Sequence, residues 1–324
     1  MLFLTSEDIR QALPMKLSIE CMRSAFSALS DGRADVPIRT HLSLSEGKGS
    51  ALFMPVYLAE TQKVAVKTVT VFKNNAQRAM PMIQALITVF DARDGRALAI
   101  MDGECLTALR TGAASGLATE ILARQEAAVL AVFGAGAQAR TQIEAVLTVR
   151  AVRKILIFDT DSVKARQLSA EISAQYKIEV IADNDQRKLQ EADIICTATS
   201  SARPVFHNRY LKEGVHINGI GSYRPEMQEV PADTVARARI VVDSRQACLK
   251  EAGDLVRPIA QGKFSAAHIY AELGDIINAK LPGRQNAKEI TFFKSVGNAV
   301  QDLVAADMVL QRAAEMGLGQ KVDF

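Results

Sequence analysis

The sequence has little of the features that mark metal, disulfide or membrane proteins. Its four cysteines are scattered and form no Cys-x-x-Cys pair, and its four histidines show no metal-ligand spacing. Such thiols are typical of a reduced compartment. No apolar run approaches the roughly 18 residues of a membrane span, and charged residues come too early for a signal peptide. We therefore expect a cytoplasmic protein with no metal and no membrane contact.

Charge of one sign is also scarce. The chain has 39 Lys and Arg against 36 Asp and Glu, a formal charge of +3 at pH 7. No basic cluster with interleaved aromatic residues occurs, which argues against a nucleic-acid partner. No Ser/His/Asp set and no paired carboxylates are recognisable in the sequence. The 324 residues, 48% of them hydrophobic, suffice for two domains with separate cores.

The most informative segment is AVLAVFGAGAQAR, which begins at Ala128. A short apolar strand leads into Gly134, Gly136 and Ala139, which form the G-x-G-x-x-A pattern of dinucleotide-binding turns. The first glycine permits the turn, and the second lets the backbone approach a pyrophosphate. The small third residue allows the helix to lie close to the strand. We expect this turn to bind the phosphates at the start of a helix.

The segment after residue 128 alternates between strands and helices, which predicts a doubly wound parallel sheet. The predicted strands are Ala128–Phe133, Lys154–Asp159, Ile178–Ile181, Asp193–Ala198, His216–Ile220 and Ile240–Asp243. Ligands bind such sheets at the carboxyl ends of the strands. The segments to watch are therefore Gly134–Gln138, Asp159, Thr197–Thr199 and Gly219–Tyr223.

The first part of the chain has a different pattern. Residues 6–31 are predicted to be helical, with Ser6 as a cap. Five strands without intervening helices follow and indicate an antiparallel sheet or small barrel; they are Ile38–Leu44, Ala51–Leu58, Val64–Phe72, Ile83–Phe90 and Ala97–Met101. A helix from Glu104 to Ala123 and a final helix from Gly297 to Met316 complete the prediction. We expect an α+β domain of residues 1–115 with 298–324, and a Rossmann domain of residues 116–297.

Asp159 ends the second strand of the predicted parallel sheet, near the roughly 20-residue separation from the first glycine that is typical of a ribose-binding acid. A carboxylate there accepts hydrogen bonds from ribose hydroxyls and repels a 2′-phosphate. We therefore expect NAD(H) as the cofactor. Lys164 and Arg166 leave NADP(H) open as an alternative.

Two basic residues stand out because they fall among apolar neighbours. Alternation in VAVKTVTVF places Lys67 on the same strand face as Ala65 and Val69. A lysine there needs a partner, which is either an anionic substrate or the solvent reached from a sheet edge. Arg110 has small and apolar helical neighbours, so its guanidinium either binds a carboxylate or phosphate of a ligand or forms an internal salt bridge. Arg39 alone carries a weaker signal.

Taken together, these segments resemble the ornithine cyclodeaminase/mu-crystallin family. The matching segments occur in family order along nearly the whole chain; they are Phe53-Met54-Pro55, VAVKTVTVF, LTALRTGAASGLAT, VFGAGAQA, ICTATSS with Pro204, INGIGSYRPEMQEV and FKSVGNAVQDLVAAD. The resemblance implies a homodimer, in which the first domain binds substrate and dimerises and the Rossmann domain binds NAD(P).

The resemblance also implies roles for individual residues. Arg39, Lys67 and Arg110, with Met54 and Val296, match positions around the substrate, and Lys67 and Arg110 are the expected catalytic residues. The expected cofactor contacts are Gly134, Gly136, Ala137, Gln138, Asp159, Thr197, Thr199, Gly219, Gly221, Ser222 and Ser295.

One departure from the family pattern decides between activities. Tyr223 stands where ornithine cyclodeaminases place an aspartate, and a phenol is a poor base at neutral pH. Mu-crystallin-like members, which reduce cyclic ketimines, also lack that aspartate. The resemblance therefore implies an NAD(P)H-dependent reductase of cyclic imino acids such as Δ1-pyrroline-2-carboxylate or Δ1-piperideine-2-carboxylate. The alternatives are an ornithine or lysine cyclodeaminase, an alanine-dehydrogenase-like enzyme and a non-catalytic NAD(P)H-dependent binding protein.

Overall fold

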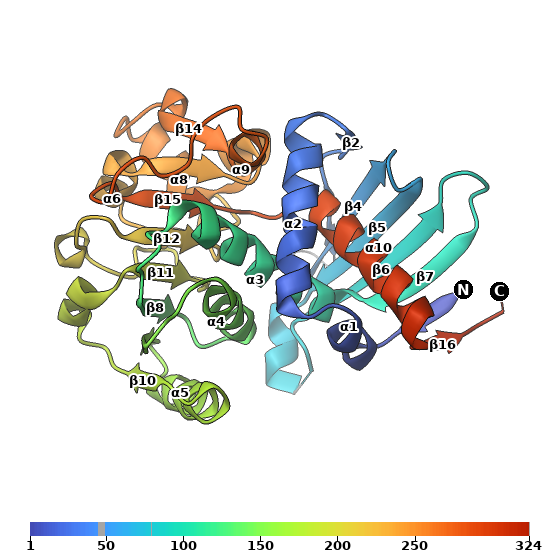
Figure 1. Cartoon of the computed structure of the whole chain (residues 1–324), viewed down its shortest axis with the longest axis horizontal. Coiled ribbons are helices and arrows are strands. Elements are labelled where there is room, and N and C mark those ends of the chain that lie inside the picture. Colours follow the sequence, from blue (N-terminus) through green and yellow to red (C-terminus); the bar gives the residue numbers. More distant parts are fainter. Residues whose placement is uncertain (45–48, 79, 324) are drawn as a thin grey trace. The chain divides into compact units, whose positions relative to one another are not determined.

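A computed structural model describes residues 1–44, 49–78 and 80–323. The chain divides into two compact units (Figure 1). The first unit comprises Met1–Arg110 and Asn298–Phe324, and the second comprises Thr111–Gly297. The division falls within one helix, α3 (Gly103–Leu122), which also contains the boundary expected between residues 115 and 116.

The first unit contains a sheet with the strand order β16-β1-β7-β6-β5-β4-β2, and β3 also pairs with β4. Its strands are β1 (Leu2–Leu4), β2 (Ala34–Asp35), β3 (Thr40–Leu44), β4 (Gly49–Leu58), β5 (Lys63–Val71), β6 (Ile83–Asp91), β7 (Ala97–Asp102) and β16 (Gln320–Lys321). The five predicted strands correspond to β3–β7, and their antiparallel pairing is confirmed. The sheet is open rather than a barrel, and the short strands β1, β2 and β16 were missed, of which β1 pairs with β7 in parallel. Strands of two or three residues are too short to show alternation in the sequence.

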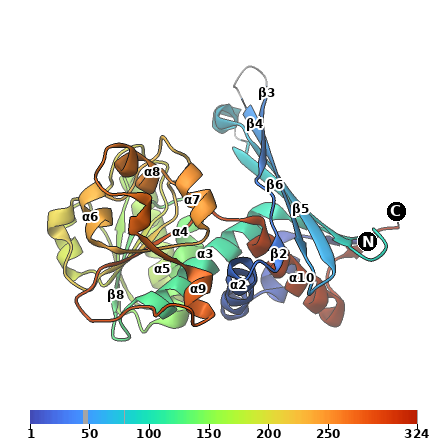
Figure 2. The ribbon, with the colours of Figure 1, turned by 90° about the horizontal axis from the view of Figure 1, so that it is seen from above.

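The first unit also contains the helices α1 (Ser6–Ala12), α2 (Met15–Ser30) and α10 (Ala299–Met316), together with the start of α3. The cap of α1 is Thr5 rather than Ser6, because the Thr5 hydroxyl and the Asp8 carboxylate form a capping box. Helix α10 packs across β4, β5 and β6 and also against α2. Figure 2 shows α2 and α10 on one side of this sheet. The face of the sheet under α10 therefore belongs to the core of the first unit.

The second unit is built on a parallel sheet, with the order β10-β9-β8-β11-β12-β15-β13-β14. Its strands are β8 (Val129–Phe133), β9 (Lys154–Phe158), β10 (Glu179–Ala182), β11 (Ile194–Thr197), β12 (His216–Gly219), β13 (Arg239–Val242), β14 (Ile269–Glu272) and β15 (Thr291–Lys294). The predicted doubly wound sheet is confirmed, but β14 and β15 were missed. Both have only four residues, and all residues of β15 are buried, so alternation cannot reveal it.

Helices cover the sheet of the second unit and enclose two apolar cores. They are α4 (Ala137–Val149), α5 (Ser162–Tyr176), α6 (Ala232–Arg237), α7 (Arg245–Glu251), α8 (Gly253–Ala260) and α9 (Leu273–Ile277). Alternation along β8 divides its side chains between the cores. Phe133 belongs to the core that includes α8 residues, and Val132 belongs to the core that includes α4 and α5 residues.

The chain reverses its direction of sheet growth at β8. Strand β9 lies on one side of β8 and β11 lies on the other. In doubly wound sheets this switch point, at the carboxyl ends of the strands, is where ligands bind. In the part of the chain that the structure describes, we find no helix long and apolar enough to cross a bilayer.

Candidate active site

The glycine-rich turn follows β8 at this switch point. Gly134 has a φ of 97°, in the left-handed region, and a Cβ atom there would lie 2.7 Å from the Ala198 carbonyl oxygen. Gly136 begins α4 without a side-chain cap, and a Cβ atom on it would meet nothing within 4 Å. Among the described residues, the buried Gln138 Oε1 has no hydrogen-bond partner. Open space, an uncapped helix start and an unused acceptor fit the pyrophosphate and ribose of a dinucleotide.

Asp159, directly after β9, binds the backbone of this turn through its carboxylate. Its Oδ2 accepts the Ala135 N–H at 2.7 Å, and its Oδ1 accepts the Asp161 N–H at 2.8 Å. A carboxylate offers about four acceptor positions, so this one can still receive ribose hydroxyls. Asp159 therefore fixes the turn in addition to the ribose-binding role expected from its position.

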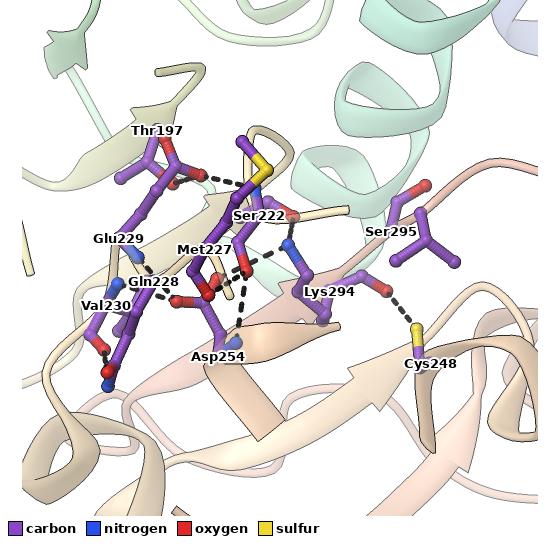
Figure 3. A network of polar contacts seen from close by, with 12 residues as sticks. Thr197, Ser222, Met227, Gln228, Glu229, Val230, Cys248, Asp254, Lys294 and Ser295 are labelled. Carbon is purple, nitrogen blue, oxygen red and sulfur yellow. Dashed lines mark hydrogen bonds and ion pairs between the residues drawn. The ribbon is translucent and has the colours of Figure 1, made fainter. Parts of the chain in front are cut away.

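The predicted cofactor residues after β11 and β12 are brought together by one buried carboxylate, Glu229 (Figure 3). Its Oε1 accepts the Thr199 N–H at 2.6 Å and the Thr199 hydroxyl at 2.8 Å. Its Oε2 accepts the Thr197 hydroxyl and the Ser222 N–H, both at 3.0 Å. The two loops approach so closely that a Cβ atom on Gly221 would lie 2.1 Å from the Thr199 carbonyl oxygen.

Two more buried charged residues, Asp254 and Lys294, lie next to Glu229. Asp254, on α8, accepts the N–H groups of Glu229 and Val230 at 2.7 and 2.9 Å through Oδ1. Lys294, at the end of β15, donates to the Gly219 carbonyl at 3.0 Å and lies 3.3 Å from Asp254 Oδ2. Burial, and next the charge of Asp254, raises the pKa of Glu229, while Lys294 opposes the shift. Sequence reasoning missed all three residues, because no paired carboxylates are recognisable in the sequence.

A similar arrangement holds the segment that contains Ser295 and Val296. Asp243 Oδ2 accepts the Ser295 hydroxyl at 2.7 Å and the N–H groups of Val296 and Gly297 at 2.9 and 2.7 Å. Both Ser295 and Val296 are buried in the second unit. Val296 thus lies in a different unit from the other residues expected to bind substrate.

Lys67 lies on the buried face of the sheet in the first unit. In register, it stands between Met54 on β4 and Ile87 on β6. Its side chain is 3% exposed, and its Nζ lies 2.6 Å from Asp302 Oδ2. The partner that Lys67 requires on this apolar face is thus a carboxylate of α10, which was not among the alternatives considered from the sequence.

Asp302 also joins Arg110 to the same cluster. Arg110 Nε donates to Asp302 Oδ1 at 2.9 Å, and its Nη1 donates to Gln301 Oε1 at 3.2 Å. The internal salt bridge considered for Arg110 therefore exists. Two buried cations share one carboxylate, so the cluster retains a positive charge that suits a bound anion.

The electrostatics of Lys67 reflect this imbalance. Burial lowers the pKa of Lys67 to about 8; Asp302 opposes the shift, whereas the positive charges of Arg110 and Arg39 add to it. Arg39 is therefore close enough to influence the cluster, as its predicted role requires. Although burial acts in the opposite direction, the charges of Lys67 and Arg110 lower the pKa of Asp302. The lysine is poised to exchange a proton near neutral pH.

A family model for the ornithine cyclodeaminase/mu-crystallin family matches residues 1–317. The chain belongs to this family. It is 39% identical to a Delta(1)-pyrroline-2-carboxylate reductase of Bacillus cereus over 100% of both chains. It is 32% identical to the ketimine reductase mu-crystallin of Mus musculus, over 95% of this chain and 96% of the relative.

A solved structure of another family member has the same fold. The Thermococcus litoralis Delta(1)-pyrroline-2-carboxylate reductase, in complex with NADH and L-proline, aligns with a TM-score of 0.95 at 37% identity, covering 99% of this chain and 100% of that one. The chain is therefore an NAD-dependent oxidoreductase of the ornithine cyclodeaminase/mu-crystallin family.

Proposed function

We propose that the protein uses NADH to reduce cyclic imino acids, with Δ1-pyrroline-2-carboxylate and Δ1-piperideine-2-carboxylate as substrates and L-proline and L-pipecolate as products. The observation that carries this proposal is the buried cluster of Lys67, Arg110 and Asp302, in which the positive charge is in excess. The proposed substrate class is that of the Delta(1)-pyrroline-2-carboxylate and ketimine reductases to which the chain is similar. The first unit is the proposed substrate-binding domain, and the second is the proposed cofactor-binding domain.

In this proposal the cations of the first unit hold the substrate carboxylate. Arg110 and Arg39 bind the carboxylate oxygens, and Met54 packs beside Lys67. When bound, NADH supplies a hydride for the imine carbon, C2. The imine nitrogen takes one proton, and Lys67, with its pKa of about 8, is the proposed donor. Asp302 orients Lys67 for this transfer and keeps it charged.

In the second unit, the residues around the switch point would hold the cofactor. The turn of Gly134, Gly136, Ala137 and Gln138 receives the pyrophosphate, and Asp159 receives the adenosine ribose. The loops of Thr197–Thr199 and Gly219–Ser222, with Ser295, lie toward the nicotinamide side. Asp159 disfavours a 2′-phosphate, so NADPH is proposed only as a weaker cofactor.

We also propose a cytoplasmic homodimer. The four cysteines are free thiols, as expected in a reducing compartment.

The proposed dimer rests on exposed apolar side chains of the first unit. Leu86, on β6, is 52% exposed although its neighbour Ile87 is buried, so Leu86 faces away from the core. Ile38, Leu42, Met82 and Ile83 are also exposed apolar residues of this unit. A second copy covering these side chains would explain them, and Leu86→Glu is expected to yield monomers in sedimentation velocity.

A spectrophotometric assay tests the proposed activity. NADH and NADPH oxidation is followed with five- and six-membered cyclic imino acids, and L-ornithine with NAD⁺ is run in parallel. We expect rapid oxidation of NADH with the imino acids. Ammonia release from L-ornithine without imine reduction would instead establish a cyclodeaminase, and tight NADH binding without any turnover would establish a binding protein.

A further inference from the structure

Glu229 occupies an unusual place in the second unit. Its carboxylate lies between the end of β11 and the end of β12 and accepts one backbone N–H from each of the following loops. These two strands are neighbours in the sheet, and β11 also neighbours β8, which leads into the glycine-rich turn. One side chain therefore sets the spacing of two loops at the edge where a dinucleotide binds.

The same carboxylate fixes the hydroxyl groups of Thr197 and Thr199. A hydroxyl has one hydrogen, and in both residues this hydrogen is directed to Glu229. The remaining lone pairs can only accept, and Thr199 Oγ1 already accepts the Ser201 N–H at 3.2 Å. Glu229 thus determines the polarity that these loops present. An acceptor suits the NH₂ group of a nicotinamide carboxamide, which is a donor.

Asp254 and Lys294 fix the position of Glu229 through the polypeptide backbone. Asp254 binds the Glu229 backbone, and Lys294 binds both Asp254 and the carbonyl of Gly219, which starts the second loop. The three side chains are completely buried. Buried charges are costly, and apolar side chains of similar size often stabilise a fold as well or better. Stability therefore gives no reason for three charges here, whereas precise placement of the loops does.

We propose that Glu229, supported by Asp254 and Lys294, is a positioning residue that shapes the Thr197–Thr199 and Gly219–Ser222 loops to receive the nicotinamide half of the cofactor. The inference rests on the proposed NADH-dependent function. It assigns no contact between Glu229 and the cofactor. It predicts that Glu229 affects the nicotinamide half of the cofactor and spares the adenosine half, which belongs to the turn at Gly134 and Gly136.

The test compares two ligands on the full-length Glu229→Gln protein. Glutamine has one acceptor oxygen, and its NH₂ group would face N–H and O–H donors. Calorimetry measures Kd for NADH and for ADP-ribose, which lacks the nicotinamide. Because bonds to a charged acceptor are lost, we expect NADH binding to weaken about 10- to 100-fold. ADP-ribose binding should remain unchanged within error.

Asp193→Asn is the matched control. Asp193 is a buried carboxylate at the other end of β11, where it accepts the Ala128 and Val129 N–H groups at 2.9 and 3.0 Å. It also pairs with Arg124 and Lys212. This variant should lower Tm but leave the ratio of the two Kd values as in the wild type. Equal losses for both ligands in Glu229→Gln, or no loss for either, would overturn the inference.

A milder pair of variants keeps the test decisive if Glu229→Gln does not fold. Thr197→Val removes one donor to Glu229 at nearly constant volume, and Thr197→Ser retains it. We expect Thr197→Val to weaken NADH binding by about fivefold without changing ADP-ribose binding, and Thr197→Ser to restore it. Identical NADH affinities in the two variants would overturn the inference. Wild-type turnover is measured separately, so a failure of the proposed function is recognised independently.

Discussion

The two units each contain a buried cluster of three charges, and the clusters have opposite composition. In the first unit, Lys67 and Arg110 share the single carboxylate of Asp302. In the second unit, Glu229 and Asp254 accompany the single cation of Lys294. In the second cluster, both oxygens of Glu229 and Asp254 Oδ1 accept backbone N–H or hydroxyl donors, and Asp254 Oδ2 faces Lys294. The first cluster retains positive charge. Each cluster carries one charge in excess, and the difference lies in what meets that excess. In the second cluster it is met by hydrogen-bond donors of the protein itself, whereas in our proposal the extra cation of the first cluster is met by the anionic substrate.

The largest effect should come from removing a cation of the first cluster. Lys67→Met should lower kcat/KM for a cyclic imino acid by about 1,000-fold, because a charge and a proton donor are lost together. NADH affinity, measured by calorimetry, should not change. Lys67→Arg is the matched variant: it keeps the charge but holds its proton too tightly to donate it. It should recover KM more than kcat, and a Lys67→Met enzyme with wild-type turnover would refute the assignment.

Removing the anion of the first cluster should have the next largest effect. Asp302→Asn leaves two buried cations without their carboxylate, which should cost about 3–5 kcal/mol of unfolding free energy. Activity should fall by about 10- to 100-fold, since Lys67 and Arg110 lose their orientation. Asp307→Asn is the control, because Asp307 is also a buried acid on α10 and pairs with the more accessible Lys63 at 2.7 Å. Equal losses of stability and activity in the two variants would contradict the account.

The pH dependence of kcat/KM should report the titration of Lys67 in the first cluster. Lys67 is charged below its pKa of about 8 and neutral above it. Since the charged form holds the carboxylate and carries the proton, kcat/KM should fall as pH rises through about 8. Substrate binding adds a negative charge, so the corresponding limb of kcat should lie at higher pH. Lys67→Arg should abolish the limb. A flat profile in the wild type up to about pH 10 would show that Lys67 does not titrate in the reaction.

Asp159 combines features of both clusters. Its carboxylate accepts two N–H groups of the protein and still has acceptor positions for a ligand. Asp159→Ser should weaken discrimination against NADPH by about tenfold, since a negative charge beside the 2′-phosphate is lost. Affinity for both dinucleotides should also fall slightly, because the Ala135 N–H loses its charged acceptor. The ratio of kcat/KM for NADH to that for NADPH measures the effect. An unchanged ratio would leave Asp159 only its support of the turn.

Local patterns predicted the parts of the fold and site that depend on neighbours in sequence. Strand–helix alternation predicted the parallel sheet. The apolar neighbours of Lys67 predicted that its ammonium needs an anionic substrate or access to solvent. The carboxylate that binds Lys67 could not be predicted, because Asp302 lies far along the chain on α10 and meets Lys67 and Arg110 only through the packing of that helix. The one available signal was an acid on the apolar face of the final helix.

Glu229, Asp254 and Lys294 were missed for the same reason. Each belongs to a different segment, and they meet only at the end of the folded sheet. Lys294 lies on β15, a strand too short for its pattern to be recognised in the sequence.

Tyr223, which decided against cyclodeamination in the sequence, is 39% exposed in the structure. The carboxylate that does reach this loop is Glu229, and its oxygens are occupied by hydrogen-bond donors.

In the proposed function, the excess positive charge of the first cluster holds the substrate carboxylate. The most direct test compares kcat/KM for Δ1-pyrroline-2-carboxylate with that for its neutral carboxamide, in the wild type, Arg110→Met and Glu229→Gln. We expect a preference for the carboxylate of about 100-fold or more in the wild type. This preference should persist in Glu229→Gln and collapse in Arg110→Met. If Arg110→Met left this preference intact, the first cluster would not be the site that holds the substrate carboxylate.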